Sequence, residues 1–130
     1  MEILTQIIIF AIAYLIGSLP FGLWVSRLVA GVDIRQRGSG HVTTTNTMRH
    51  AGWGAGALVL ILDMAKGFLP TFISIFWDFP IWGTTLVAVF VVIGHCWPVF
   101  AGFKGGMGIA ATGGALLASN LFGALVALGT

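Results

Sequence analysis

The stretch ILTQIIIFAIAYLIGSLPFGLWV, residues 3–25, decides the class of fold. It has no charged residue between Glu2 and Arg27, and a helix needs about 20 apolar residues to cross a bilayer. The apolar run is longer than the core of a usual signal peptide, and Glu2 stands where such peptides carry basic residues. We therefore expect a retained transmembrane helix.

Three further apolar stretches follow, over about residues 51–77, 81–100 and 108–128. The chain is 58% hydrophobic and 8% charged, whereas soluble domains carry about 25% charged residues. These features predict an all-α, polytopic integral membrane protein with about four transmembrane segments, forming a single domain over residues 1–130. The net charge of +2, with no run of basic residues, argues against nucleic-acid binding. The four scattered acidic residues suggest no metal site, and Cys96 is a single cysteine.

The distribution of basic residues predicts the orientation in the membrane. Residues 26–50 contain four arginines and one acidic residue, Asp33, so the positive-inside rule makes this loop cytoplasmic and the N-terminus external. The loop around Lys104 then returns to the cytoplasm of an inner (plasma) membrane, which gives two polar cytoplasmic loops. The aromatic turn at residues 77–82 faces outward. The four arginines are Arg27, Arg35, Arg37 and Arg49. They could also serve only to set this topology.

The first loop contains a polar segment, GSGHVTTTNTMR, at residues 38–49. Gly38 and Gly40 allow a backbone to approach an anion closely, and Arg49 can bind two phosphate oxygens at once. The side chains of Ser39, Thr45 and Asn46 can donate hydrogen bonds. The segment predicts a phosphate-binding site, with a solvated interhelical turn as the alternative.

The second loop reads GFKGGMG at residues 102–108. Glycines around Lys104, including Gly105 and Gly106, just before an apolar stretch resemble an anion-binding helix start. The alternative is an interfacial lysine that extends to lipid headgroups. His95, a few residues earlier, could be a hydrogen-bonding partner or proton carrier, or a structural residue capping the third helix.

Two opposite charges interrupt the second apolar stretch. Asp63 and Lys66 are three residues apart, which places them on one face of a helix where they can pair. A charge at the centre of a bilayer costs about 2.5–3.5 kcal/mol on insertion scales. The pair could link helices or line a polar cavity. Alternatively, glycines and Pro70 could divide the stretch into shorter helices, with the pair nearer water.

Several segments, in order and with matching spacing, resemble the bacterial acyl-phosphate:glycerol-3-phosphate acyltransferases of the PlsY type. The resemblance covers nearly the whole chain. The matching segments are AYLIGSLPFG at 13–22, DIR at 33–35, GSG at 38–40, Thr45-Asn46 with Arg49, Asp63 with Lys66-Gly67, GH at 94–95, PVF at 98–100 and GFKGG at 102–106.

The resemblance implies transfer of a fatty acyl group from acyl phosphate to the 1-hydroxyl of glycerol 3-phosphate, giving lysophosphatidic acid for phospholipid synthesis, with no cofactor. Acyl phosphate, glycerol 3-phosphate and membrane lipid are then the partners. It implies that Ser39, Asn46 and Arg49 bind phosphate, with Gly38 and Gly40 shaping the site. Lys104, Gly105 and Gly106 would form its second wall, and Arg35, Asp63, Lys66 and His95 would support it. It identifies no catalytic residue.

The chain departs from the family pattern at several positions. His41, Thr43 and Thr44 replace Asn, Gly and Ala of the first motif, and Met107 replaces a second lysine. We also expect the chain to lack the C-terminal helices and third polar motif of the family. The alternatives are a non-catalytic relative that binds phosphorylated lipid or partners a complete enzyme, and a small transporter subunit.

Overall fold

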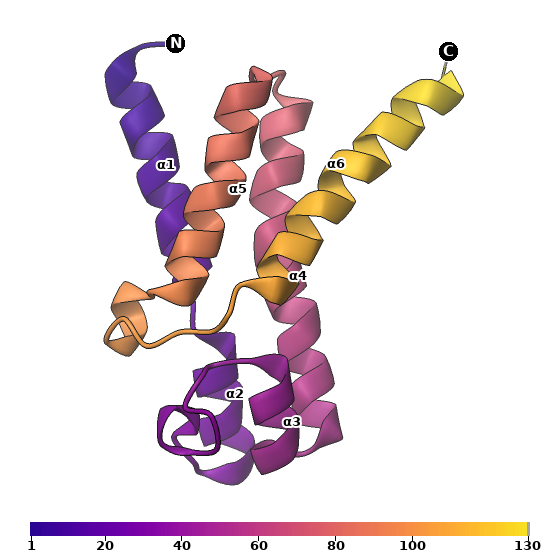
Figure 1. Cartoon of the computed structure of the whole chain (residues 1–130). Helices are drawn as coiled ribbons and strands as arrows, with labels where there is room; N and C mark the ends of the chain where they lie inside the picture. Colours follow the sequence, from indigo (N-terminus) through magenta and orange to yellow (C-terminus); the bar gives the residue numbers. More distant parts are fainter. Residues whose placement is uncertain (130) are drawn as a thin grey trace.

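The computed structural model describes residues 1–129, and its regular structure over that range is helical throughout (Figure 1). Four segments of the described chain are long and apolar enough to cross a bilayer, which confirms the predicted all-α membrane fold. The elements are α1 (Ile3–Gly17), α2 (Phe21–Ala30), the 3-10 turn η1 (Ile34–Gln36), α3 (Thr44–Ala51), α4 (Trp53–Phe76), α5 (Ile81–Cys96), the 3-10 turn η2 (Val99–Ala101) and α6 (Ile109–Gly129).

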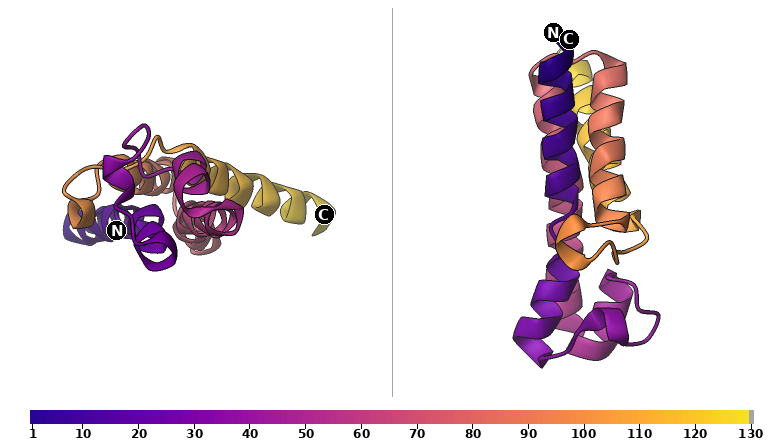
Figure 2. Two further views of the ribbon diagram at one scale, coloured as in Figure 1. Left: turned by 90° about the horizontal axis from the view of Figure 1, so that it is seen from below. Right: turned by 90° about the vertical axis from the view of Figure 1, so that its left-hand side faces the viewer.

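The two ends of the molecule differ: one has short turns between long helices, and the other has the two polar loops and is called the loop-bearing end. The N-terminus, the turn between α4 and α5 and the end of α6 lie at one end, while α2, α3 and η1 lie at the other, as two perpendicular views agree (Figures 1 and 2). α4 is the central element and packs against α1, α2, α3, α5 and α6. Its 24 residues extend about 36 Å, so its lower half passes the ends of α1 and α5 and supports the polar end.

The first apolar stretch is two helices, so the expectation of one continuous helix is wrong at residues 18–20. α1 has 15 residues, which gives a length of about 22 Å. Pro20 has no N–H to continue the helical hydrogen bonds, and the chain redirects there before α2 begins at Phe21. Residues 3–30 together still form one candidate membrane span.

The second apolar stretch, in contrast, forms the single helix α4, so division into shorter helices is wrong. Pro70 lies inside this helix, where it removes one backbone hydrogen bond. The adjacent Thr71 hydroxyl donates to the Gly67 carbonyl at 2.8 Å, which uses a backbone acceptor in the same turn. Neighbouring helices and such hydroxyl contacts allow proline within membrane helices.

Glycines bring the helix backbones into close contact at two interfaces. At Gly114 of α6, an added Cβ would collide with the backbone of Met64 in α4, and at Gly67 of α4 it would collide with Ala111. Small residues at such contacts let membrane helices pack through van der Waals contact, because lipid removes the hydrophobic drive between them. The glycines in these contacts are Gly17 and Gly94 between α1 and α5, and Gly67 and Gly114 between α4 and α6.

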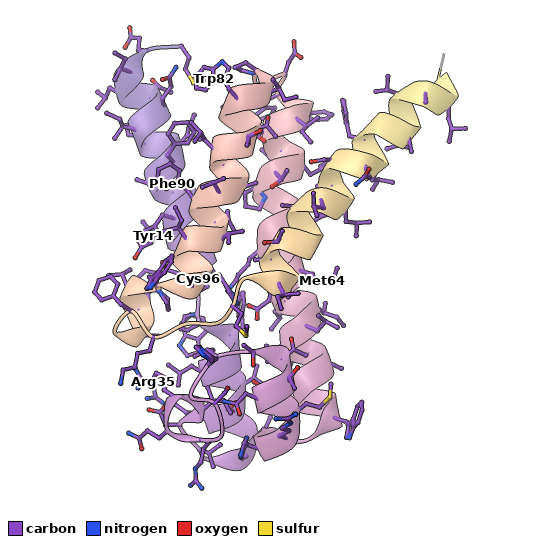
Figure 3. All side chains as sticks on the ribbon, viewed as in Figure 1. Tyr14, Arg35, Met64, Trp82, Phe90 and Cys96 are labelled. Atoms are coloured by element: carbon purple, nitrogen blue, oxygen red, sulfur yellow. The ribbon has the colours of Figure 1, made fainter. Side chains whose placement is uncertain are left out.

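The aromatic turn between α4 and α5 lies at the end of the bundle opposite the polar loops. Figure 3 shows Trp82 at one end and Arg35 at the other. Trp77 and Trp82 are exposed, as expected of residues that sit at a membrane–water interface. The two polar loops therefore share one end of the molecule, as the sequence predicted.

We predict that Gly114→Ala destabilises the α4–α6 interface while Gly113→Ala does not. A methyl group at position 114 meets the Met64 backbone, which must move, whereas nothing lies within 4 Å of one at position 113. Overpacking of this kind costs about 1–3 kcal/mol. Thermal unfolding in detergent micelles should show a lower Tm for Gly114→Ala only. Equal Tm values for the two variants would contradict this packing.

Candidate functional site

The two polar loops are joined by hydrogen bonds that involve backbone atoms. The Val42 N–H donates to the Gly105 carbonyl at 2.9 Å, and the Arg35 guanidinium donates to the Ala101 carbonyl at 3.0 Å. Segments about 60 residues apart in sequence thus form one surface at the loop-bearing end. Arg35 supports the site by joining the two loops.

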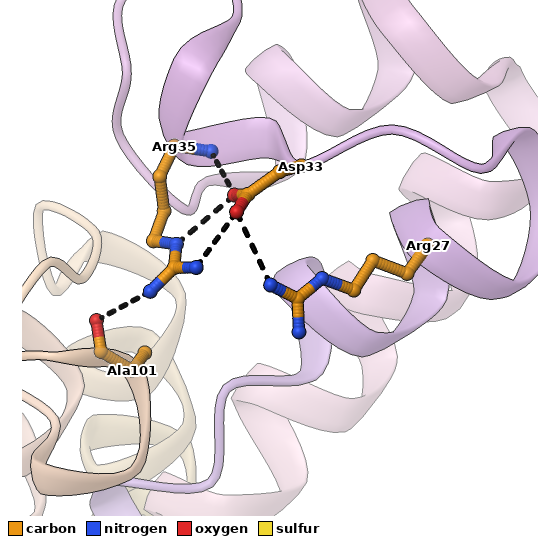
Figure 4. Close-up of polar contacts among 4 residues, drawn as sticks. All are labelled: Arg27, Asp33, Arg35 and Ala101. Atoms are coloured by element: carbon orange, nitrogen blue, oxygen red, sulfur yellow. Dashed lines mark hydrogen bonds and ion pairs between the residues drawn. The ribbon is translucent and has the colours of Figure 1, made fainter.

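Arg35 is held in place by Asp33 (Figure 4). The Asp33 carboxylate lies 2.7 Å from Arg35 Nη2 and 3.1 Å from Arg27 Nη2. It also accepts the Arg35 backbone N–H at 3.0 Å, which caps η1. Hydrogen bonds from Arg35, then from Arg27, hold the pKa of Asp33 well below its usual range, and the same pairing raises the pKa of Arg35.

Asn46 organises the first loop from inside. Its side chain is buried, and its amide nitrogen lies 3.0–3.3 Å from the backbone carbonyls of Ile34, Arg37 and His41. An asparagine amide has two hydrogens to donate, so both are engaged within the loop. In this structure Asn46 shapes the loop without presenting a free donor, and its binding of a phosphate stays a prediction.

Thr43 begins the short helix α3. Its hydroxyl accepts the Asn46 N–H at 3.1 Å, the usual arrangement of a helix N-cap. The backbone N–H groups of Thr44 and Thr45 have no hydrogen-bond partner among the described residues. Unpaired N–H groups in the first turn of a helix attract anions. Thr43 therefore fixes an N-terminus that faces the site.

An inner cavity of 460 Å³ lies between α3, α4 and the start of α6. Arg49 lines it, and the Arg49 guanidinium forms no ion pair or hydrogen bond with any residue that the structure describes. Its unpaired charge is available to an anionic ligand. The lining residues are Ser39, His41, Thr43, Thr44, Thr45, Asn46, Arg49, Leu60, Asp63, His95, Met107, Gly108, Ile109 and Ala110.

An outer groove of 510 Å³ adjoins the inner cavity and shares Ser39, His41 and Met107 with it. The cation of this groove is Lys104, whose ammonium likewise has no partner within residues 1–129. The remaining lining residues are Gly40, Cys96, Trp97, Phe103, Gly105 and Gly106. The site thus consists of two adjoining hollows, each lined by one arginine or lysine that has no partner in the described chain.

Lys104 does not begin a helix, so that expectation is wrong. It lies on the turn after η2, five residues before α6 starts at Ile109. Gly105 and Gly106 pack against His95, whose carbonyl oxygen and ring leave no room for a Cβ atom at either position. Close contact with His95 explains why both residues are glycines, and both also line the outer groove, so their place in the second wall of the site stays a prediction.

Asp63 and Lys66 form the predicted ion pair, with Lys66 Nζ 2.8 Å from Asp63 Oδ1. Both side chains are buried, and Lys66 also donates to the Leu19 carbonyl at 3.0 Å. The pair links helices, and Asp63 in addition lines the inner cavity, so both sequence interpretations hold. His95 lies in the last turn of α5, with Nδ1 3.7 Å from Asp63 Oδ1.

Some functional atoms could not be identified from residue type. The carbonyls of Leu19 and Ala101 accept bonds from basic side chains, and Cys96 and Trp97 line the outer groove. Pro20, inside an apolar stretch, was the one sequence signal of the break between α1 and α2, which frees the Leu19 carbonyl to accept a side-chain hydrogen bond. Nothing in the sequence indicated the role of Ala101.

Comparison with known proteins gives the site its context. The family model described as glycerol-3-phosphate acyltransferase matches residues 7–130. The chain belongs to this family. A glycerol-3-phosphate acyltransferase of Geobacillus kaustophilus (strain HTA426) is 43% identical over 110 residues, which cover 85% of this chain and 55% of the relative. One of Rubrobacter xylanophilus is 42% identical over 113 residues, covering 87% and 56%.

Solved structures of family members show the same fold. The crystal structure of PlsY, an integral membrane glycerol 3-phosphate acyltransferase, in its glycerol 3-phosphate form matches with a TM-score of 0.83 at 42% identity, covering 96% of this chain and 64% of that one. The lysophosphatidic acid form matches with a TM-score of 0.80 at 40% identity, covering 95% and 61%. The chain spans about half the length of the curated relatives it matches.

We predict that Asp33→Asn destabilises the protein at neutral pH and that the effect fades in acid. The lowered folded pKa means that the Asp33 carboxylate stabilises the folded state above about pH 4, its ordinary value. That contribution, about 1–2 kcal/mol, is lost as pH falls from there towards the lower folded pKa. Thermal unfolding of both proteins at pH 7 and pH 3 measures it. Asp78→Asn, at an exposed carboxylate without an ion pair in the described chain, serves as control.

We also predict that Asn46→Asp disrupts the first loop. A carboxylate of the same shape offers no hydrogens to the three carbonyls and repels them, and the loss of these bonds costs about 1–3 kcal/mol. Hydrogen exchange should show lower protection across α3 than in the wild type. Thr45→Ser, at the exposed neighbouring position, should retain wild-type protection. Equal protection in Asn46→Asp would overturn the assigned role.

Proposed function

We propose that the protein transfers a fatty acyl group from acyl phosphate to the 1-hydroxyl of glycerol 3-phosphate, giving lysophosphatidic acid. The observation that carries the proposal is the pair of adjoining hollows, each lined by one arginine or lysine without a partner in the described chain, Arg49 or Lys104. Two phosphate-bearing substrates need two cations close together. Relatives with about 42% identity include structures in glycerol 3-phosphate and lysophosphatidic acid forms, which supports this ligand class.

The linings of the two hollows suggest how the substrates divide between them. Leu60, Ile109 and Ala110 border the inner cavity, so it suits acyl phosphate, with its phosphate at Arg49 and its tail toward the membrane helices. The outer groove is bordered by Lys104 and suits the water-soluble glycerol 3-phosphate. Ser39 lines both hollows, at the position where the substrates would meet.

The reaction asks little covalent chemistry of the protein. Acyl phosphate is already activated: the glycerol hydroxyl oxygen bonds to the acyl carbon, the bond from that carbon to the phosphate oxygen breaks, and phosphate leaves with the hydroxyl proton. Holding the hydroxyl oxygen beside the acyl carbon, oriented for attack, lowers the entropic part of the barrier. Cations and N–H groups near the phosphates offset the charge that develops on the leaving group. Arg49, Lys104 and the α3 N-terminus supply these functions.

We place the loop-bearing end in the cytoplasm of a plasma membrane, with the N-terminus outside. Arg27, Arg35, Arg37, Arg49 and Lys104 all belong to this end, while the opposite turn has Asp78 and no basic residue. This asymmetry follows the positive-inside rule. A cytoplasmic site also has access to glycerol 3-phosphate, a charged solute that does not cross a bilayer unaided.

A second function is favoured by Met107, which lines both hollows where the family pattern has a lysine. A site with one cation fewer could bind phosphorylated lipid without turning it over. In this alternative, the chain binds lysophosphatidic acid, or partners a complete enzyme.

We predict that Arg49→Ala reduces acyl transfer at least 100-fold, because it removes the only cation of the inner cavity among described residues. The assay is lysophosphatidic acid formation by the purified chain in lipid nanodiscs, with acyl phosphate and, in parallel, acyl-CoA as donor. Arg37→Ala is the matched control, since Arg37 is exposed on the same loop but lines neither hollow; it should retain wild-type turnover.

The outcomes separate the two functions. Product from acyl phosphate that depends on Arg49 supports the acyltransferase. Binding of lysophosphatidic acid by folded protein without product from either donor supports the alternative. Equal turnover in Arg49→Ala and the wild type would refute the phosphate-binding role of Arg49.

A further inference from the structure

We infer that Asp63, Lys66 and His95 form a positioning cluster that fixes the two polar loops relative to each other. The inference rests on the proposed function only for its effect on substrate binding. Three buried side chains connect α4 to the break between α1 and α2 and to both loops.

Lys66 connects α4 to the break between α1 and α2. Its ammonium donates to the Leu19 carbonyl at 3.0 Å, pairs with Asp63 at 2.8 Å and lies 5.5 Å from the centroid of the Phe21 ring. The chain turns into α2 immediately after this contact and then enters the first loop. Lys66 thus sets where α2, and with it the first loop, leaves the bundle.

His95 connects the same cluster to the second loop. Its ring nitrogen Nδ1 lies 3.7 Å from Asp63 Oδ1, and its carbonyl accepts the Gly106 N–H at 3.2 Å. Gly105 and Gly106 are so close to His95 that neither has space for a side chain. The second loop therefore rests directly on His95.

The two connections meet at the contact between the loops. The Val42 N–H of the first loop donates to the Gly105 carbonyl of the second, next to the contact of Gly106 with His95. A cavity of 10 Å³, at the lower limit of the space that can hold one water molecule, is bordered by residues of the cluster and of both loops. They include Leu19, Val42, Asp63, Lys66, His95 and Gly105. We therefore expect a shift of one member to disturb the others.

The cluster also keeps a carboxylate compatible with an anion site. Asp63 lines the inner cavity together with Arg49, and an uncompensated negative charge there would repel phosphate. Lys66 offsets that charge from the buried side. Breaking a buried ion pair on one side is strongly destabilising, whereas replacing both partners with neutral residues is often nearly neutral for stability. If the pair has only a structural role, neutralising both partners should restore the protein. If the pair positions the loops, stability should recover while the loops stay displaced.

The test compares Lys66→Met and Asp63→Asn with the double variant. We expect each single variant to lower Tm and the double variant to recover most of the loss. If the cluster positions the loops, the double variant still lacks the bond to Leu19. Its Val42 and Gly106 amides should then exchange roughly tenfold faster than in the wild type, and KM for glycerol 3-phosphate should rise by roughly the same factor.

Two further variants keep the result decisive. Ser74→Ala/Thr84→Val removes a buried hydroxyl contact of 3.3 Å at the other end of the bundle; it should lower Tm without changing exchange at Val42 or Gly106. If the double variant does not fold, His95→Gln is measured instead and should speed exchange at Gly106.

Wild-type exchange at Val42 and Gly106 in the folded double variant, or at Gly106 in His95→Gln, would overturn the inference. The exchange measurement needs no substrate. A wild-type chain that neither binds glycerol 3-phosphate nor forms product would therefore refute the proposed function and leave the test of the cluster intact.

Discussion

The bond from the Lys66 ammonium to the Leu19 carbonyl is the interaction on which the polar end depends. Pro20 interrupts the first membrane segment and leaves backbone groups that lipid cannot satisfy. A cation from α4, neutralised by Asp63, meets that need within the protein. Burying two charges is costly in a membrane protein, and here the same pair holds the first segment at the angle that delivers α2 and the first loop to their places.

The candidate site at the polar end is held together largely by contacts to backbone atoms. The loops meet through Val42 and Gly105, Asn46 binds three carbonyls, and Arg35 reaches the Ala101 carbonyl. These contacts use the side chains of Asn46 and Arg35, whereas those of Arg49 and Lys104 form no hydrogen bond or ion pair within the described chain. Arg27 and Arg35 share the Asp33 carboxylate and Lys66 pairs with Asp63, so the charges that face the two hollows without a partner in the described chain are those of Arg49 and Lys104.

Much of this could be predicted from local sequence, because hydropathy, charge asymmetry and i,i+3 spacing act over short distances. The four membrane segments, the shared end of both loops and the Asp63–Lys66 pair follow from such patterns. The uninterrupted α4 and the roles of Asn46, Gly105 and Gly106 could not, since each depends on tertiary neighbours. Asn46 is a plausible phosphate ligand by type, and only the folded course of its own loop, which brings three carbonyls to its amide, shows where its hydrogens go in this structure.

The way the loops are docked has a consequence for how this site can evolve. The three residues that the hollows share, Ser39, His41 and Met107, belong to the rim and contribute no side-chain bond between the loops. Exchanging them alters the polarity of the rim while the docking, made through main-chain atoms and buried residues, persists. Point substitutions at the rim can therefore change which groups face a ligand while the scaffold that holds both loops stays constant.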